Sequence, residues 1–119
     1  MAGSSIHHIA LRTTDVDALV SFYTEVLGLR VVRDARPLSV WLAIDEGSVL
    51  MIEKRGPGEP AIAQGSMEMF AVAVTAQQKA AIRAVAAQRG CLDGETEHTL
   101  YLRDLDGRRV GASNYPFDF

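Results

Sequence analysis

Cysteine is nearly absent from this chain of 119 residues, because Cys91 is its single cysteine. An internal disulfide and a zinc site built from several thiolates are therefore excluded. A free cysteine is usually a small buried side chain, and we expect that role for Cys91. Residues 1–5 are small and polar and do not resemble a signal peptide. A reducing, cytoplasmic compartment is the simplest expectation.

The chain also lacks long apolar runs and an excess of positive charge. No run approaches the roughly 20 apolar residues that a membrane-spanning helix needs, so no membrane contact is expected. The 12 Lys and Arg residues are scattered and are outnumbered by 15 Asp and Glu residues, so no nucleic-acid partner is expected. A glycine-rich phosphate loop, a Ser–His–Asp spacing and a Cys–His nucleophile signature are missing as well.

What the chain contains is one pattern written twice, in the order strand, helix, further strands. Alternating apolar and polar residues predict the strands, and the helices follow from apolar spacing and N-cap residues. The predicted strands cover residues 6–12, 30–34, 38–44, 48–54, 67–74, 97–103 and 108–114. The predicted helices cover residues 15–27 and the stretch from the capping box of Thr75 and Gln78 to Gly90.

The repeat predicts one α+β domain over residues 1–119, because a unit this short cannot bury its sheet alone. A first module is expected over residues 5–56 and a second over residues 67–119. Residues 57–66, which combine Gly, Pro and polar residues, form the linker between them.

Period-two alternation divides the predicted strands into two faces. One face is nearly all apolar and is expected under the helices: Ile9, Leu11, Leu50, Ile52, Phe70, Val72, Leu100, Leu102, Val110 and Ala112. The other face mixes small, thioether, aromatic and polar side chains: His8, Ala10, Arg12, Trp41, Ala43, Met51, Glu53, Met69, Ala71, Tyr101, Arg103, Gly111 and Ser113.

Three segments resemble the glyoxalase/bleomycin-resistance/dioxygenase proteins, the vicinal oxygen chelate superfamily. They are His-Ile-Ala-Leu-Arg-Thr-Thr-Asp at 8–15, Ser-Phe-Tyr-Thr-Glu-Val-Leu-Gly-Leu at 21–29, and the hairpin Asp-Leu-Asp-Gly-Arg-Arg-Val-Gly at 104–111. The resemblance covers both halves of the chain. It implies two βαβββ modules whose curled mixed sheets form a cleft, and the association of two chains as a homodimer.

The resemblance also implies where metal ligands would lie, one on the first and one on the last strand of each module. These positions hold His8, Met51, Met69 and Gly111. A zinc, manganese or iron site needs about three nitrogen or oxygen ligands from the protein, and only His8 is retained. Glu53, two residues past Met51 on the same face, adds at most a second ligand. A divalent metal cofactor is therefore not expected.

Without a metal, the mixed face is typical of a small-molecule pocket. Trp41 and Tyr101 are suited to sandwich a planar ligand, and Arg12 or Arg103 to pair with a ligand carboxylate. Alternatively, the aromatic and Met side chains only fill the core. The predicted ligand-binding residues are His8, Arg12, Trp41, Met51, Glu53, Met69, Tyr101, Arg103 and Ser113.

The expected function is metal-free binding of a small, partly planar organic molecule, as in the drug-sequestering members of the family. Three roles stay open for His8: a hydrogen-bonded remnant, an acid or base near neutral pH, or a metal ligand. The alternative function is a metal-dependent lyase, isomerase or dioxygenase, or a metal-free acid–base catalyst, that uses His8 and Glu53. A third class is a structural or regulatory partner of another protein.

Overall fold

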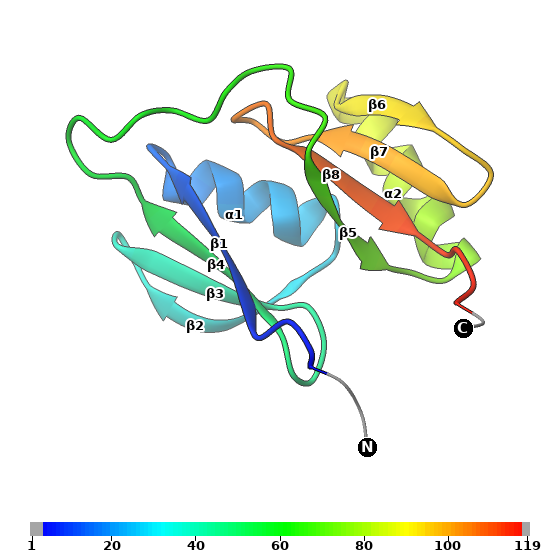
Figure 1. Cartoon of the computed structure of the whole chain (residues 1–119), viewed down its shortest axis with the longest axis horizontal. Coiled ribbons are helices and arrows are strands. Elements are labelled where there is room, and N and C mark those ends of the chain that lie inside the picture. The colour runs from blue at the N-terminus through cyan, green and yellow to red at the C-terminus, as the bar shows by residue number, and fades with distance from the viewer. Residues whose placement is uncertain (1–3, 118–119) are drawn as a thin grey trace. The chain divides into compact units, whose positions relative to one another are not determined.

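The computed structural model describes residues 4–117 and divides into two compact units, residues 1–61 and 62–119 (Figure 1). Residues 1–3 of the polar start lie outside the described residues. The first unit contains β1 (His8–Thr13), α1 (Val16–Glu25), β2 (Arg30–Ala35), β3 (Ser39–Ala43) and β4 (Val49–Lys54). The second contains β5 (Met69–Ala73), α2 (Ala76–Arg89), β6 (Leu92–Glu95), β7 (Thr99–Arg103) and β8 (Arg109–Ser113). The predicted α+β fold of two βαβββ modules is confirmed.

The two sheets have the same topology. Their strand orders are β1-β4-β3-β2 and β5-β8-β7-β6, and in each sheet the first pair is parallel while the other pairs are antiparallel. Met51 is paired with Ala10 and Trp41. Gly111 is paired in the same way with Ala71 and Tyr101, so Trp41 and Tyr101 occupy equivalent positions in the two sheets.

Each helix begins at a side chain that caps it. The Asp15 carboxylate accepts a hydrogen bond from the backbone N–H of Ala18 at 3.0 Å, which satisfies one of the amides that the first turn leaves unpaired. Thr75 and Gln78 form the predicted capping box at the start of α2. Gly90 ends α2 with φ of 67°, a left-handed conformation that suits glycine.

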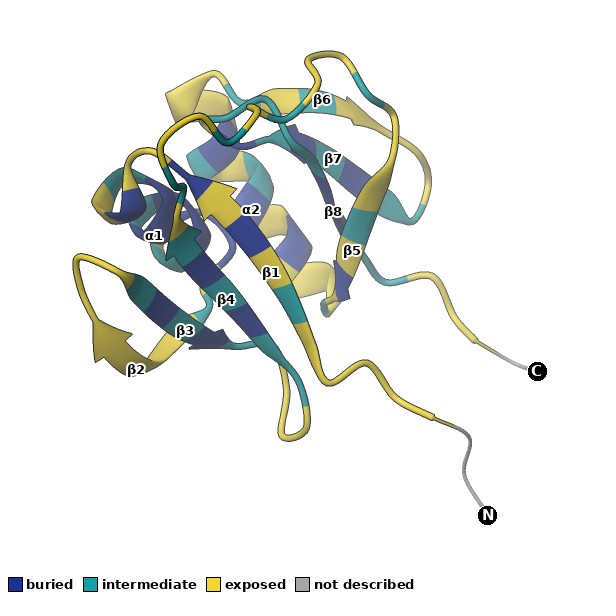
Figure 2. Ribbon diagram, turned by 60° about the vertical axis from the view of Figure 1, so that its left-hand side comes forward, coloured by how far each residue is buried: buried dark blue, intermediate teal, exposed yellow. Residues whose placement is uncertain are grey.

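The apolar face of each sheet lies in the core, as the alternation predicted. Leu50, Ile52 and Leu102 are completely buried, and β1 and β4 alternate between buried and more exposed residues (Figure 2). Full burial stabilises each such side chain by about 1.5–3 kcal/mol relative to exposure. Ile9 and Phe70, at the starts of the edge strands β1 and β5, are only half-buried.

Two expectations needed correction. The strand β6 was not predicted, because Leu-Asp-Gly-Glu contains a single large apolar residue and a glycine, which weakens a strand. Cys91 is half-buried rather than buried, and its partial burial raises the pKa of the thiol. Among residues 4–117, no helix has both the length and the apolar character to cross a membrane.

Candidate functional site

The face of the first sheet that points away from α1 is its open face, and Trp41 lies in the middle of it. Trp41 on β3 is level with Met51 on β4, which is level with Ala10 on β1. On the other side, Arg33 on β2 is opposite Trp41, and its guanidinium carbon lies 4.9 Å from the centre of the indole ring. We call these four residues the Trp41 row. All four are half-buried or exposed, so the row offers accessible stacking surface with a cation at one end.

A β-bulge places Arg33 in the Trp41 row. Val31 is opposite Leu42, the pairing then skips Val32, and Arg33 is opposite Trp41. The extra residue shifts the alternation of β2 by one and turns the Arg33 side chain onto the open face. Arg33 could not be assigned to this face from the sequence, because period-two alternation carries no signal for an inserted residue.

Arg12, a predicted ligand-binding residue, is held within the first unit by two glutamates. Its guanidinium donates to Glu53 at 3.2 Å and to both carboxylate oxygens of Glu59 at 3.0 and 2.8 Å. Hydrogen bonding from Arg12, with help from the backbone N–H of Gly56, lowers the pKa of Glu59 to about 2. The same bonds raise the pKa of Arg12. A ligand carboxylate would therefore compete with two internal partners for Arg12.

His8 and Glu53 are not brought together by the first sheet. The parallel pairing of β1 with β4 sets His8 level with Val49 and sets Glu53 level with Arg12. Four residues along a strand span about 13 Å, so the proposed His8–Glu53 proton-transfer pair does not form in this register. His8 is exposed, and its Nδ1 lies 3.0 Å from Nδ1 of His7.

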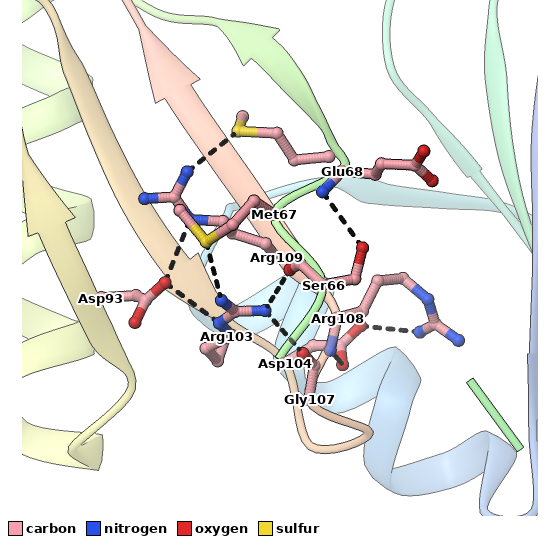
Figure 3. Close-up of polar contacts among 10 residues, drawn as sticks. Ser66, Met67, Glu68, Asp93, Arg103, Asp104, Gly107, Arg108 and Arg109 are labelled. Carbon is pink, nitrogen blue, oxygen red and sulfur yellow. Dashed lines mark hydrogen bonds and ion pairs between the residues drawn. The ribbon is translucent and has the colours of Figure 1, made fainter. Parts of the chain in front are cut away.

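The open face of the second sheet carries an aromatic ring with an arginine already neutralised. The guanidinium carbon of Arg109 lies 4.0 Å from the centre of the Tyr101 ring. Asp93 accepts hydrogen bonds from Nε of Arg109 and Nε of Arg103, both at 3.0 Å (Figure 3). The hydrogen bond from Arg109 is the main cause that lowers the pKa of Asp93, and the charge and hydrogen bond of Arg103 lower it further.

Arg103, another predicted ligand-binding residue, ties the chain before β5 to the β7–β8 hairpin. It donates to the backbone oxygens of Ser66 at 2.8 Å and Gly107 at 3.1 Å (Figure 3). Gln64 adds a parallel tie by donating to the backbone oxygen of Asp106 at 2.8 Å. Arg103 thus has a structural role within the second unit.

Met69 lies over Gly111, and these are two of the four positions where the family resemblance implies metal ligands. A Cβ at Gly111 would stand 2.7 Å from the Met69 methyl carbon and 3.1 Å from the Ala71 Cβ. A carboxylate at Gly111 would require the end of Met69 to move away. Within residues 4–117, no group of three or more His, Cys, Asp or Glu side chains is placed to hold a metal ion.

Ser113 is engaged with its neighbours at the end of β8. Its hydroxyl lies 2.8 Å from that of Thr99, the residue opposite it on β7, and accepts a hydrogen bond from the backbone N–H of Tyr115 at 3.1 Å. Its predicted ligand contact, like those of the other residues in the set, stays a prediction.

Residues 5–107 match the family model described as Glyoxalase/Bleomycin resistance protein/Dioxygenase superfamily. Among solved structures, oxidase ChaP-H2 is similar with a TM-score of 0.77 at 20% identity, covering 98% of this chain and 97% of that one. Lactoylglutathione lyase from Agrobacterium tumefaciens has a TM-score of 0.71 at 20% identity, with 95% of both chains covered.

The fosfomycin resistance protein FosX from Listeria monocytogenes has a TM-score of 0.75 at 11% identity, covering 100% of this chain and 96% of that one. At these identities the likeness to solved structures concerns the fold alone. No curated protein matches the sequence significantly.

Proposed function

Because the chain belongs to the Glyoxalase/Bleomycin resistance protein/Dioxygenase superfamily, we propose that it binds a small, partly planar organic molecule without a metal ion. The observation that carries this proposal is the Met69 thioether over the bare backbone of Gly111. Two of the four ligand positions that the family resemblance implies are therefore adjacent to each other and supply neither nitrogen nor oxygen.

The donor set explains why a metal does not fit. Thioether sulfur suits soft ions such as Cu(I), whereas zinc, manganese and iron sites of this kind need nitrogen and oxygen donors. Met51 is a second thioether, and it stands between Ala10 and Trp41. What the family uses as a coordination position is here part of an apolar stacking surface, which suits a planar organic ligand.

Fluorescence and metal analysis of the purified protein test the proposal. Trp41 is the only tryptophan, so its emission reports on the Trp41 row directly. We expect planar aromatic compounds to quench it, and we expect Met51→Ala to weaken that quenching by removing a contact surface. Leu105→Ala, an exposed apolar change outside the row, serves as the control. One bound zinc, nickel, manganese or iron ion per chain, lost on His8→Ala, would contradict metal-free binding.

A metal-dependent lyase, isomerase or dioxygenase is the second candidate. The similar structures include a lyase and an oxidase, which supports this candidate, as does the exposed imidazole of His8. Glu53 is poorly suited to act as a metal ligand or base, because its carboxylate already forms an ion pair with Arg12 at 3.2 Å. Metal-dependent turnover that survives Glu53→Gln but not His8→Ala would establish the enzyme.

We further propose that the protein is a cytoplasmic homodimer. The exposed side chains of Ile6, Leu38 and Met67, each more than 60% accessible, support association with a second chain. The unpaired thiol of Cys91 is consistent with a reducing compartment. Light scattering of the purified protein should give twice the chain mass of 12.9 kDa. A monomer mass at micromolar concentration would contradict the dimer.

A further inference from the structure

Arg33 differs from Arg12, Arg103 and Arg109 on the two open faces because no carboxylate neutralises it. Arg12 is paired with Glu53 and Glu59, and Arg109 is paired with Asp93. Within residues 4–117, Arg33 forms no ion pair, and its guanidinium carbon lies 4.9 Å from the centre of the Trp41 ring. The side chain is exposed, so its hydrogen-bond donors are accessible to a ligand.

The way in which Arg33 is held suits recognition of a carboxylate. A guanidinium stacked on an aromatic ring uses its face, and its edge of N–H donors stays available for a bidentate bond. The bulge at Val32 and the indole both restrict where Arg33 points. Less side-chain freedom is therefore lost when a ligand binds than for a flexible surface arginine.

The rest of the Trp41 row suits an aromatic body attached to that carboxylate. Neighbouring strands lie about 4.8 Å apart, so the row from Ala10 to Arg33 spans about 14 Å across four strands. This length accommodates a bicyclic aromatic ring with an acidic group at one end. Met51 and Trp41 supply adaptable and planar apolar contact along it.

We propose that Arg33 and Trp41 together select planar aromatic carboxylates as the ligand class of this protein. The inference rests on the proposed small-molecule binding and adds the acidic group to it. Arg33 is the residue that determines specificity, and Trp41 both orients Arg33 and stacks on the ligand.

Two probes that differ only in charge test the inference. 2-Naphthoate and its neutral analogue 2-naphthamide are titrated into ¹⁵N-labelled full-length protein at pH 7, and the single indole N–H signal of Trp41 is followed. We expect 2-naphthoate to bind about three- to tenfold more tightly, the range for an accessible charge-assisted pair. Salt at 1 M should reduce the difference by screening.

Variants of β2 separate a specific contact from general attraction. Arg33→Gln should remove the preference for 2-naphthoate and leave 2-naphthamide binding intact, and Arg33→Lys should restore only part of it, since an ammonium lacks the bidentate geometry. Arg30→Gln is the matched control, because it removes the same charge from the same strand at a position opposite Ala43 rather than an aromatic ring. Well-dispersed amide spectra verify that each variant is folded.

Each contradicting outcome is distinct. Equal binding of the two probes to the unchanged protein overturns the role of Arg33 and leaves the proposed function standing. A loss of preference in Arg30→Gln equal to that in Arg33→Gln also overturns it, because the attraction is then not local. If neither probe shifts the Trp41 signal at millimolar concentration, the proposed function fails and this inference fails with it.

Discussion

The two units share a topology and a β-bulge, but the arginines on their open faces differ in whether carboxylates neutralise them. In β2 the pairing skips Val32 and sets Arg33 opposite Trp41, and in β6 it skips Asp93 and sets Gly94 opposite Tyr101. The first unit thus presents an arginine without a counter-charge. The second presents a carboxylate that already neutralises two arginines. The two residues at the bulge therefore distinguish the two faces: the first face carries an arginine without an ion pair, and the arginines of the second face are paired with Asp93.

Truncation of a buried side chain beneath either open face should lower the free energy of unfolding strongly and by a similar amount in the two units. Leu42 and Leu102 are equivalent, both completely buried and both level with the residue before the bulge. Leu42→Ala and Leu102→Ala should each lower the free energy of unfolding by about 2–5 kcal/mol through lost burial and a cavity. Urea unfolding measures this. A loss below 1 kcal/mol in one variant alone would show that the units do not share the packing described.

Breaking the network of the second unit should have a smaller effect. Asp93→Asn leaves Arg103 and Arg109 without their shared counter-charge, and we expect unfolding to become easier by about 1 kcal/mol. Val32→Ala, the exposed change at the equivalent position of the first unit, should stay within about 0.5 kcal/mol. The urea midpoints of the two variants measure this difference. An equal loss of stability in both would show that the ion pairs of Asp93 do not stabilise the second unit.

Converting the first unit toward the second should reduce anion binding. Val32→Asp introduces at β2 the carboxylate that Asp93 supplies at β6. Like-charge repulsion should weaken 2-naphthoate binding about two- to threefold, with 2-naphthamide unaffected. Val32→Asn controls for size and polarity. Unchanged 2-naphthoate binding in Val32→Asp would show that the bulged residue has no influence on the Trp41 row.

The smallest expected effect concerns acid stability of the first unit. Arg12 lowers the folded-state pKa of Glu59 to about 2 from its ordinary 4.5, so the pair stabilises the fold above pH 4.5. This contribution is lost as the pH falls from 4.5 to about 2. Glu59→Gln should therefore lower the urea midpoint at pH 7 but not at pH 2. Glu46→Gln, at an exposed turn, is the control, and an equal shift at both pH values would contradict the ion pair.

The fold could be predicted from the sequence because its signals are local and repeated. Alternation sorted buried Leu50 and Leu102 from accessible Trp41 and Tyr101, and caps such as Thr75 marked where helices begin. These signals depend on neighbours along the chain.

The candidate site was less predictable because it depends on pairing between strands. Arg33 reaches Trp41 only through a bulge, and Arg12 finds Glu59 across 47 positions of sequence. The His8–Glu53 pair was proposed from a shared face, but the parallel register separates the two along the strands. Two residues on the same face of a sheet point in the same direction, but their separation depends on the strand register.

Hydrogen bonds attach the segment that connects the two units to the first unit at one end and to the second unit at the other end. Glu59 accepts a hydrogen bond from Arg12 in the first unit, and Gln64 donates one to the backbone oxygen of Asp106 in the second. Residues 60–63 are what lies between these anchors. Extra chain spliced into that short stretch would lengthen the tether without disturbing either module. Cleavage there would give two fragments, one with the Arg12–Glu59 hydrogen bond and the other with the Gln64–Asp106 hydrogen bond.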